Sequence, residues 1–166
     1  MAGSSKQPSP PSRLAWELDL RGTTPAFLPG VRVWAAKELP SLGVAHLADV
    51  MLVAVELVTN AYEHGGGPLT IRMTRSALPC VIGVEVDDVN AEAPTVGVSR
   101  FGVDANRGRG LVMIDKIAEG WGATWHTTGG KTVWARISCE RSPCQTAAHN
   151  ASPASSPAAS EGSAIS

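Results

Sequence analysis

The sequence predicts an α+β domain in which helices cover one face of a mixed, largely antiparallel sheet. Segments with strand and helix periodicity come in clusters, in the order β-α-α-β-β-loop-α-β-β, rather than in strict alternation. Four of the expected strands also form two pairs joined by short turns, which favours hairpins. A chain of 166 residues with 43% hydrophobic residues is long and apolar enough to bury one core of ordinary size.

Both ends of the chain are expected to be disordered tails. Residues 1–12 are rich in serine and proline, and residues 141–166 are rich in alanine, serine and proline with almost no large apolar side chains. Such segments cannot bury enough apolar surface to offset the entropy lost on ordering. One domain, residues 13–140, therefore remains.

The first half of this domain is expected to contain a strand and two helices. Residues 14–20 (LAWELDL) alternate apolar and polar side chains, as a half-buried strand does. A helix centred on residues 31–39 lies between a Thr-Pro start and a Pro-Ser-Leu-Gly stop. Residues 46–64 form a long apolar helix, and three glycines at residues 65–67 end it.

The second half is expected to contain two hairpins. Residues 69–75 and 80–88 are strands on either side of a short Ser-Ala-Leu-Pro turn. Residues 123–127 and 131–138 flank a Thr-Gly-Gly turn in the same way.

Bulk composition excludes several classes of function. A formal net charge of −1, from 14 basic and 15 acidic residues, argues against direct nucleic-acid binding driven by charge. No apolar run approaches the roughly 18 residues that span a membrane, and the N-terminus has no apolar signal segment. Three cysteines, Cys80, Cys139 and Cys144, with no CxxC motif indicate a reduced, cytoplasmic protein.

The long apolar helix carries two polar residues on one side. Eight of the nine residues 50–58 are apolar, the ninth is Glu56, and Asn60 follows one turn later. These two residues either belong to a solvated back face or line a cavity. The apolar flanks favour the cavity, because a half-buried glutamate is costly without a polar partner. There Glu56 could act as a general base and Asn60 could bind a metal through its carbonyl oxygen.

A long loop leads into a helix that opens with two glycines. Residues 90–107 show no periodicity and contain proline and glycine, so we expect a flexible loop of the kind that often acts as a lid. Residues 108–120 follow at helical spacing and place Gly108 and Gly110 at the start of the helix. Glycines there let the free N–H groups of a helix N-terminus approach an anion, although such an opening is weak evidence alone.

Two further polar residues lie at strand ends. Asp88 follows Val84 and Val86 in period two, so it either faces the same side as those valines or takes part in the turn. Thr132 is the small hydroxyl beside the Thr-Gly-Gly turn that could face a cavity.

The order and spacing of these motifs resemble the GHKL ATPase superfamily, which contains the histidine-kinase-like ATPase domains. The shared features are a Glu-x-x-x-Asn pair on a buried helix, an acid at a strand end, a flexible loop, Gly-x-Gly opening a helix and Gly-Lys-Thr on a strand. The small size and the segments ELVTNAYEHG, GRGLVMID and GGKTVWARI are similar to the branch of anti-sigma factors and switch-protein serine kinases. The likeness covers nearly all of residues 14–138.

This resemblance implies a two-layer α/β sandwich that holds ATP and Mg²⁺ between helices and sheet under a mobile lid. In the family pattern Glu56 is the catalytic base, Asn60 binds Mg²⁺, Asp88 accepts a hydrogen bond from the adenine amino group, Gly108 and Gly110 wrap the phosphates, and Thr132 supports the adenine end. One departure stands out, because the superfamily usually carries D-x-G-x-G where this chain reads Asp88-Val89-Asn90-Ala91-Glu92.

The resemblance therefore implies an ATP-binding anti-sigma factor with serine/threonine kinase activity toward an antagonist protein. Its partners are a sigma factor and the antagonist, and the family also suggests a homodimer. The departure after Asp88 motivates an alternative, a non-catalytic anti-sigma binding module in which ATP is only structural or absent. A third hypothesis, a stand-alone ATPase or a histidine-directed kinase, ranks last because no phosphoacceptor-histidine helix pair is visible.

Overall fold

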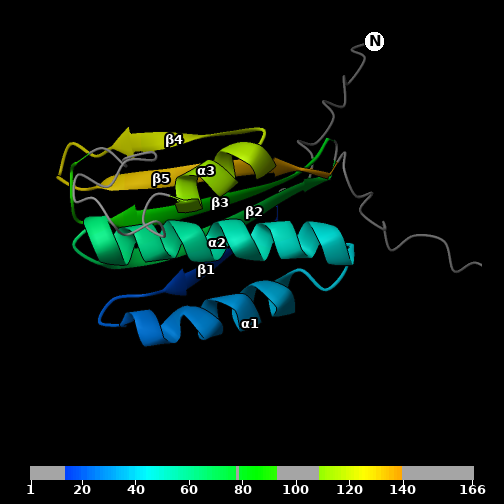
Figure 1. The fold of residues 1–166 in the computed structure, drawn as a ribbon, viewed down its shortest axis with the longest axis horizontal. Coiled ribbons are helices and arrows are strands. Elements are labelled where there is room, and N and C mark those ends of the chain that lie inside the picture. The colour runs from blue at the N-terminus through cyan, green and yellow to red at the C-terminus, as the bar shows by residue number, and fades with distance from the viewer. Residues whose placement is uncertain (1–13, 78, 93–108, 140–166) are drawn as a thin grey trace, which may run out of the picture.

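Five strands of one sheet lie beside three α-helices in the computed structural model of the chain, which describes residues 14–77, 79–92 and 109–139 (Figure 1). The strands are β1 (Leu14–Asp19), β2 (Pro68–Ala77), β3 (Cys80–Asp88), β4 (Gly120–Trp125) and β5 (Lys131–Ser138). The helices are α1 (Leu28–Glu38), which follows a short 3₁₀ turn η1 (Pro25–Phe27), α2 (Val44–His64) and α3 (Arg109–Ile117). The expected tails and most of the expected loop fall outside the described residues.

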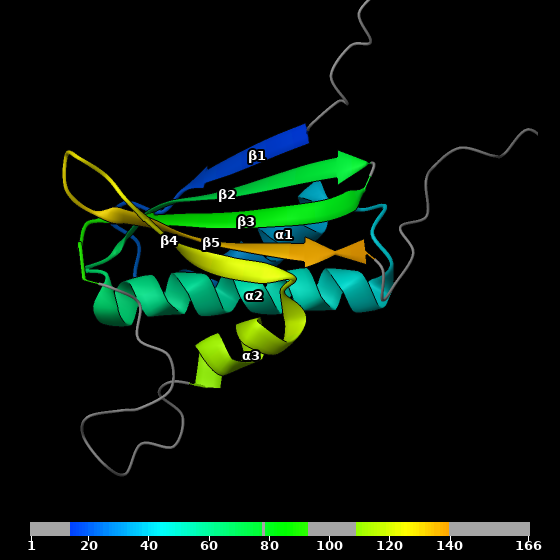
Figure 2. The same cartoon turned by 90° about the horizontal axis from the view of Figure 1, so that it is seen from above.

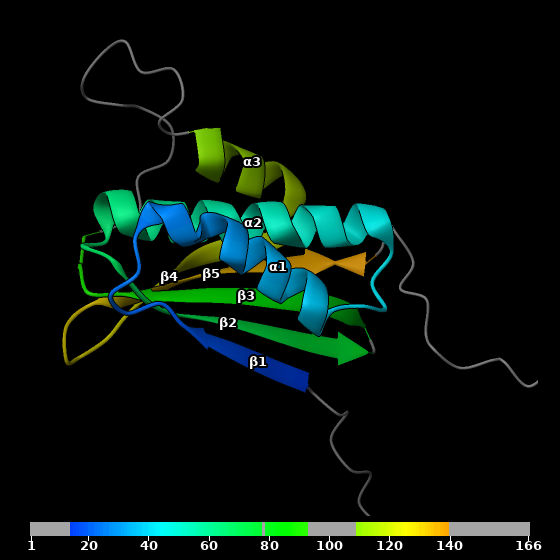
Figure 3. The same cartoon turned by 90° about the horizontal axis from the view of Figure 1, so that it is seen from below.

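The described elements form two layers. The sheet order is β1-β2-β3-β5-β4, and each neighbouring pair is antiparallel. All three α-helices lie on one face, with α2 between α1 and α3 (Figures 2 and 3). The prediction of an α+β domain with helices on one face is confirmed. The prediction of a mixed sheet is wrong for the described strands, because β5 lies between β3 and β4 and runs antiparallel to both.

The observed elements overlap the expected ones, but α3 ends at Ile117 rather than at residue 120, and β4 is longer at its start than expected. This strand begins at Gly120 rather than at residue 123. The segment Gly-Trp-Gly shows no strand periodicity, but Gly122 pairs with Trp134 of β5. A Cβ built on Gly122 would lie 3.0 Å from Trp134 Cζ2, so glycine gives the indole room. Tertiary packing therefore extends the strand beyond its sequence signal.

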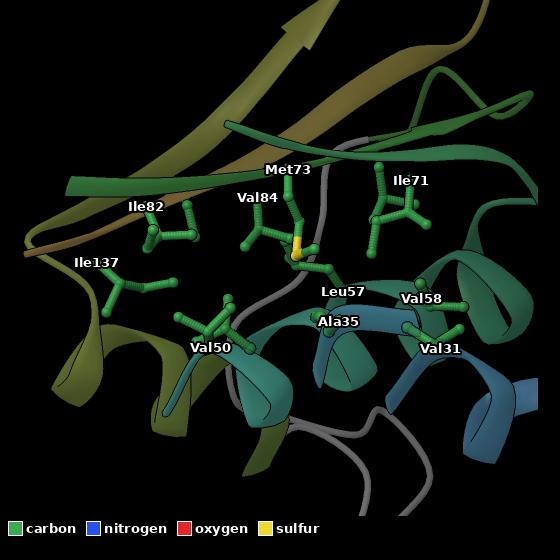
Figure 4. Close-up of a cluster of buried hydrophobic side chains, with 14 of the residues drawn as sticks. Val31, Ala35, Val50, Leu57, Val58, Ile71, Met73, Ile82, Val84 and Ile137 are labelled. Carbon is green, nitrogen blue, oxygen red and sulfur yellow. The ribbon is translucent and has the colours of Figure 1, made fainter. Parts of the chain in front are cut away.

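The core lies between α2 and the middle of the sheet (Figure 4). Alternate residues of β2, β3 and β5 point toward the helices, because side chains of a strand alternate between its faces. They pack against the buried sides of α1 and α2, and each fully buried aliphatic side chain contributes about 1.5–3 kcal/mol. The contacting side chains include Ile71, Met73, Ile82, Val84 and Ile137 from the sheet and Val31, Ala35, Val50, Leu57 and Val58 from the helices.

Helix α2 is more apolar than its uninterrupted apolar runs in the sequence indicate. Its 21 residues meet the length and composition of a membrane span, contrary to the expectation that no segment does. A core helix of a folded domain meets the same criteria. In this structure α2 buries Val50, Val53, Leu57 and Val58 in the core that it shares with the sheet.

The interpretation of the cysteines as reduced is wrong for two of the three. Cys80 at the start of β3 and Cys139 just after β5 form a disulfide with a Cα–Cα distance of 5.4 Å. The pairing of Val81 with Ser138 places them opposite each other on neighbouring strands. The spacing of the cysteines in the sequence does not reveal this register. Cys144 lies outside the described residues, and the cytoplasmic location stays a prediction.

Candidate functional site

Glu56 and Asn60 lie one turn apart on the side of α2 that faces away from the core. Both side chains are half-buried, whereas Leu57 and Val58 between them are buried in the core. Burial raises the pKa of the Glu56 carboxyl above its ordinary value, and the negative charge of Glu63 acts in the same direction. Glu56 is therefore a desolvated carboxyl with a raised affinity for a proton, which suits a general base.

The first turn of α3 packs directly on Glu56. A Cβ built on Gly110 would overlap Glu56 Oε2, so any larger residue at position 110 would displace the carboxylate or the helix. The free N–H groups and positive dipole end of α3 begin at this turn. The structure thus brings Glu56 and Gly110 together, although they are far apart in the sequence. Gly108 lies outside the described residues.

Asp88 lies at the end of β3, on the same face of the sheet as Val84 and Val86. Its side chain is only 1% exposed. Oδ1 accepts hydrogen bonds from Lys131 Nζ at 2.9 Å and from the backbone N–H of Asn90 at 3.1 Å. Oδ2 is buried and has no hydrogen-bond partner among the described residues. Burial raises the pKa of Asp88, and the Lys131 ammonium opposes that rise.

The end of α2 packs against the Asp88 carboxylate. A Cβ built on Gly65 would lie 2.7 Å from Asp88 Oδ2, so glycine lets the helix end approach this closely. On the other side, a Cβ built on Gly130 would overlap the Asp88 carbonyl oxygen, and Gly130 has a positive φ of 79°. Gly65 therefore packs on the side chain of Asp88, and Gly130 packs on its backbone.

Lys131 is the site residue that the sequence interpretation missed. Its side chain is 2% exposed, and its Nζ donates to Asp88 Oδ1 and, at 2.8 Å, to the carbonyl oxygen of Asn90. It belongs to the inward series of β5, which continues with Val133 and Ala135. That alternation was a readable signal for a lysine pointing toward the helices.

Thr132, in contrast, lies on the opposite face of the sheet. Its hydroxyl donates to Asp87 Oδ1 and lies 2.7 Å from His126 Nε2. Thr70 also donates to Asp87 on this face. The structure therefore does not bring Thr132 to Asp88, and a support for a ligand at Asp88 would have to come from Lys131 instead.

The chemistry of these side chains fits a nucleotide and one Mg²⁺ in part. The unpartnered Oδ2 of Asp88 suits an amino donor such as that of adenine, and the first turn of α3 at Gly110 brings a helix N-terminus, which favours phosphate, close to Glu56. No group of three His, Cys, Asp or Glu gathers within residues 14–77, 79–92 and 109–139. A Mg²⁺ here would take the Asn60 amide oxygen and complete its shell with phosphate oxygens and water, as this ion commonly does.

Comparison with known proteins does not assign the chain to a family: no protein-family model matches it, and no curated protein does either.

Proposed function

We propose that this chain is an ATP-binding regulatory protein with the GHKL fold, an anti-sigma factor that phosphorylates a serine or threonine of an antagonist protein. The observation that carries the proposal is the line of polar groups along α2. Glu56 lies beneath the first turn of α3, Asn60 follows one turn later, and Asp88 is packed on the helix end at Gly65. The two-layer α+β architecture is compatible with the proposed fold.

The spacing along α2 suits an extended nucleotide. Glu56 and Gly65 are nine positions apart in the sequence, which corresponds to about 13.5 Å at the rise of an α-helix. A base at Asp88 would therefore place its phosphates toward Asn60 and Glu56. The positive end of α3 lies at Glu56, where phosphate charge needs neutralising.

Phosphoryl transfer depends on positioning and charge more than on covalent chemistry. When bound, ATP with Mg²⁺ supplies the phosphoryl group. Glu56 accepts the proton of the attacking hydroxyl, and its raised pKa favours that acceptance. Asn60 would hold the metal through its amide oxygen, and Gly110 of α3 covers the Glu56 carboxylate.

One observation favours the alternative of a non-catalytic binding module. Asp88, the residue expected to recognise adenine, is already paired with Lys131 and is covered from solvent. If this pair never opens, regulation comes from binding a sigma factor or an antagonist alone.

Calorimetric titration of the full chain with ATP and Mg²⁺ tests the proposal, using Asn60→Ala and the control Asp49→Asn. Asp49 lies on the same side of α2 as Glu56 but about two turns earlier. We expect Asn60→Ala to weaken binding at least about tenfold, as the loss of one hydrogen-bonded metal ligand predicts. Asp49→Asn should bind as the wild type does. Equal binding by all three proteins would contradict the metal role of Asn60, and ATP turnover abolished by Glu56→Gln would exclude the non-catalytic alternative.

A further inference from the structure

The Lys131–Asp88 pair closes the base end of the proposed nucleotide site. Both side chains are almost fully buried, and Nζ lies 2.9 Å from Asp88 Oδ1. Gly65 packs on the Asp88 carboxylate, and Gly130 packs on the Asp88 backbone carbonyl. Because Asp88 is 1% exposed, a ligand from solvent does not reach the carboxylate while the pair is intact. The remaining oxygen, Oδ2, is a buried acceptor without a described partner, which is the kind of group that a ligand donor satisfies.

Resting on the proposed nucleotide function, we propose that Lys131 is a specificity-determining residue that occupies the base subsite and must leave Asp88 before a purine base can bind there. The amino group of the base then takes the place of the ammonium as donor to Asp88. The departing ammonium also releases the carbonyl oxygen of Asn90, to which it donates at 2.8 Å. Base binding is thereby linked to the backbone that follows β3.

This exchange lowers the affinity of the wild type. Binding of a base has to break the charge-assisted hydrogen bond between Lys131 and Asp88, which is stronger than a bond between neutral groups. A smaller residue at position 131 removes that cost and leaves Asp88 available to the base. We therefore expect Lys131→Thr to bind ATP at least about tenfold more tightly than the wild type. Its preference for ATP over GTP should also increase, because recognition then depends on the Asp88 carboxylate alone.

The first experiment compares ATP and GTP binding by calorimetry for the full-length wild type, Lys131→Thr and the control Lys37→Thr. Lys37 is an exposed lysine on α1, so its replacement leaves binding unchanged. Tighter ATP binding by Lys131→Thr supports the proposal. Unchanged or weaker ATP binding by folded Lys131→Thr contradicts the role proposed for Lys131. The proposed nucleotide function is judged separately, because it stands if wild-type binding of ATP is weakened by Asn60→Ala. Absence of ATP binding in every protein would overturn both.

A second measurement needs no variant and so does not depend on the folding of Lys131→Thr. The wild-type chain is treated with an amine-reactive ester with and without saturating ATP and Mg²⁺, and each lysine is quantified by mass spectrometry. Lys131 should be protected in the free protein and labelled when ATP is bound, whereas exposed Lys37 and Lys116 should react equally in both. Lys131 that stays protected in the saturated protein would show that the ammonium does not leave Asp88.

Discussion

Replacing Lys131 by methionine should destabilise the fold strongly, and more so at high pH. Methionine keeps the length of the side chain but removes the charge and the donors to Asp88 and Asn90. Because Asp88 is 1% exposed, the variant leaves a buried carboxylate without its counter-ion. Breaking a buried pair in this way costs about 3–5 kcal/mol. We expect a loss of that size at pH 8, measured by urea denaturation.

The pH dependence follows from the raised pKa of Asp88. A carboxyl group with a raised folded-state pKa contributes stability that is full below its unfolded value, about 3.9, and is lost as pH rises through the folded value. Without Lys131 the folded pKa rises further, so the deficit of Lys131→Met should shrink toward pH 4. Near pH 4 the remaining loss of stability comes only from the hydrogen bonds that Lys131 donated, and we expect it to be about 1–2 kcal/mol.

Two further variants serve as comparisons for Lys131→Met. Arg72→Met breaks an ion-pair network with Glu17 and Glu85 on the open face of the same sheet, where Arg72 is 38% exposed. Such exposed pairs contribute about 0–1 kcal/mol, so this control should change little. The double variant Asp88→Asn/Lys131→Met should lose less than the sum of its single changes. A loss below about 1 kcal/mol for Lys131→Met at pH 8 would refute the buried ion pair.

Two other substitutions test contacts that hold the site in place. Cys80→Ser should destabilise the chain by about 4 kcal/mol, because the bond to Cys139 closes a loop with a sequence separation of 59. A reductant should lower the midpoint of urea denaturation of the wild type but not of Cys80→Ser. A wild-type midpoint that does not change with reductant would contradict the Cys80–Cys139 bond. Gly110→Ala should change the free energy of unfolding by no more than about 1 kcal/mol, because the overlapped Glu56 Oε2 is the end of a flexible side chain that can turn away. Glu56→Ala should change that effect in the double variant, and strict additivity in urea denaturation would exclude direct contact.

Period-two and helical patterns predicted most of the elements because each pattern depends on neighbouring residues alone. Period two from Val84 and Val86 predicts one of two alternatives for Asp88, the face of β3 that those valines occupy, and the structure has it there. The same count along β5 from Ile137 leads to Lys131 rather than Thr132. The Gly-Lys-Thr motif contains both side chains, and only the alternation along β5 shows that the lysine rather than the threonine faces the helices.

Other features could not be predicted because they depend on how distant elements pack. The contact of Gly110 with Glu56 requires the docking of α3 on α2, and no local pattern encodes that docking. The Cys80–Cys139 bond requires the β3–β5 register, which a count of cysteines does not contain. The burial of Asp88 likewise depends on the end of α2 at Gly65.

The two roles considered for Lys131 can be separated because they predict different combinations of stability and affinity. If the Lys131–Asp88 pair only stabilises the fold, removing the ammonium lowers stability and leaves nucleotide affinity unchanged or reduced. If the ammonium also occupies the base subsite, the same removal lowers stability and raises affinity, since binding no longer has to break the pair. Opposite changes in the two quantities are not expected from general loosening of the domain, which weakens both. Measuring urea stability and ATP affinity on one variant therefore distinguishes a structural ion pair from one that controls access to Asp88.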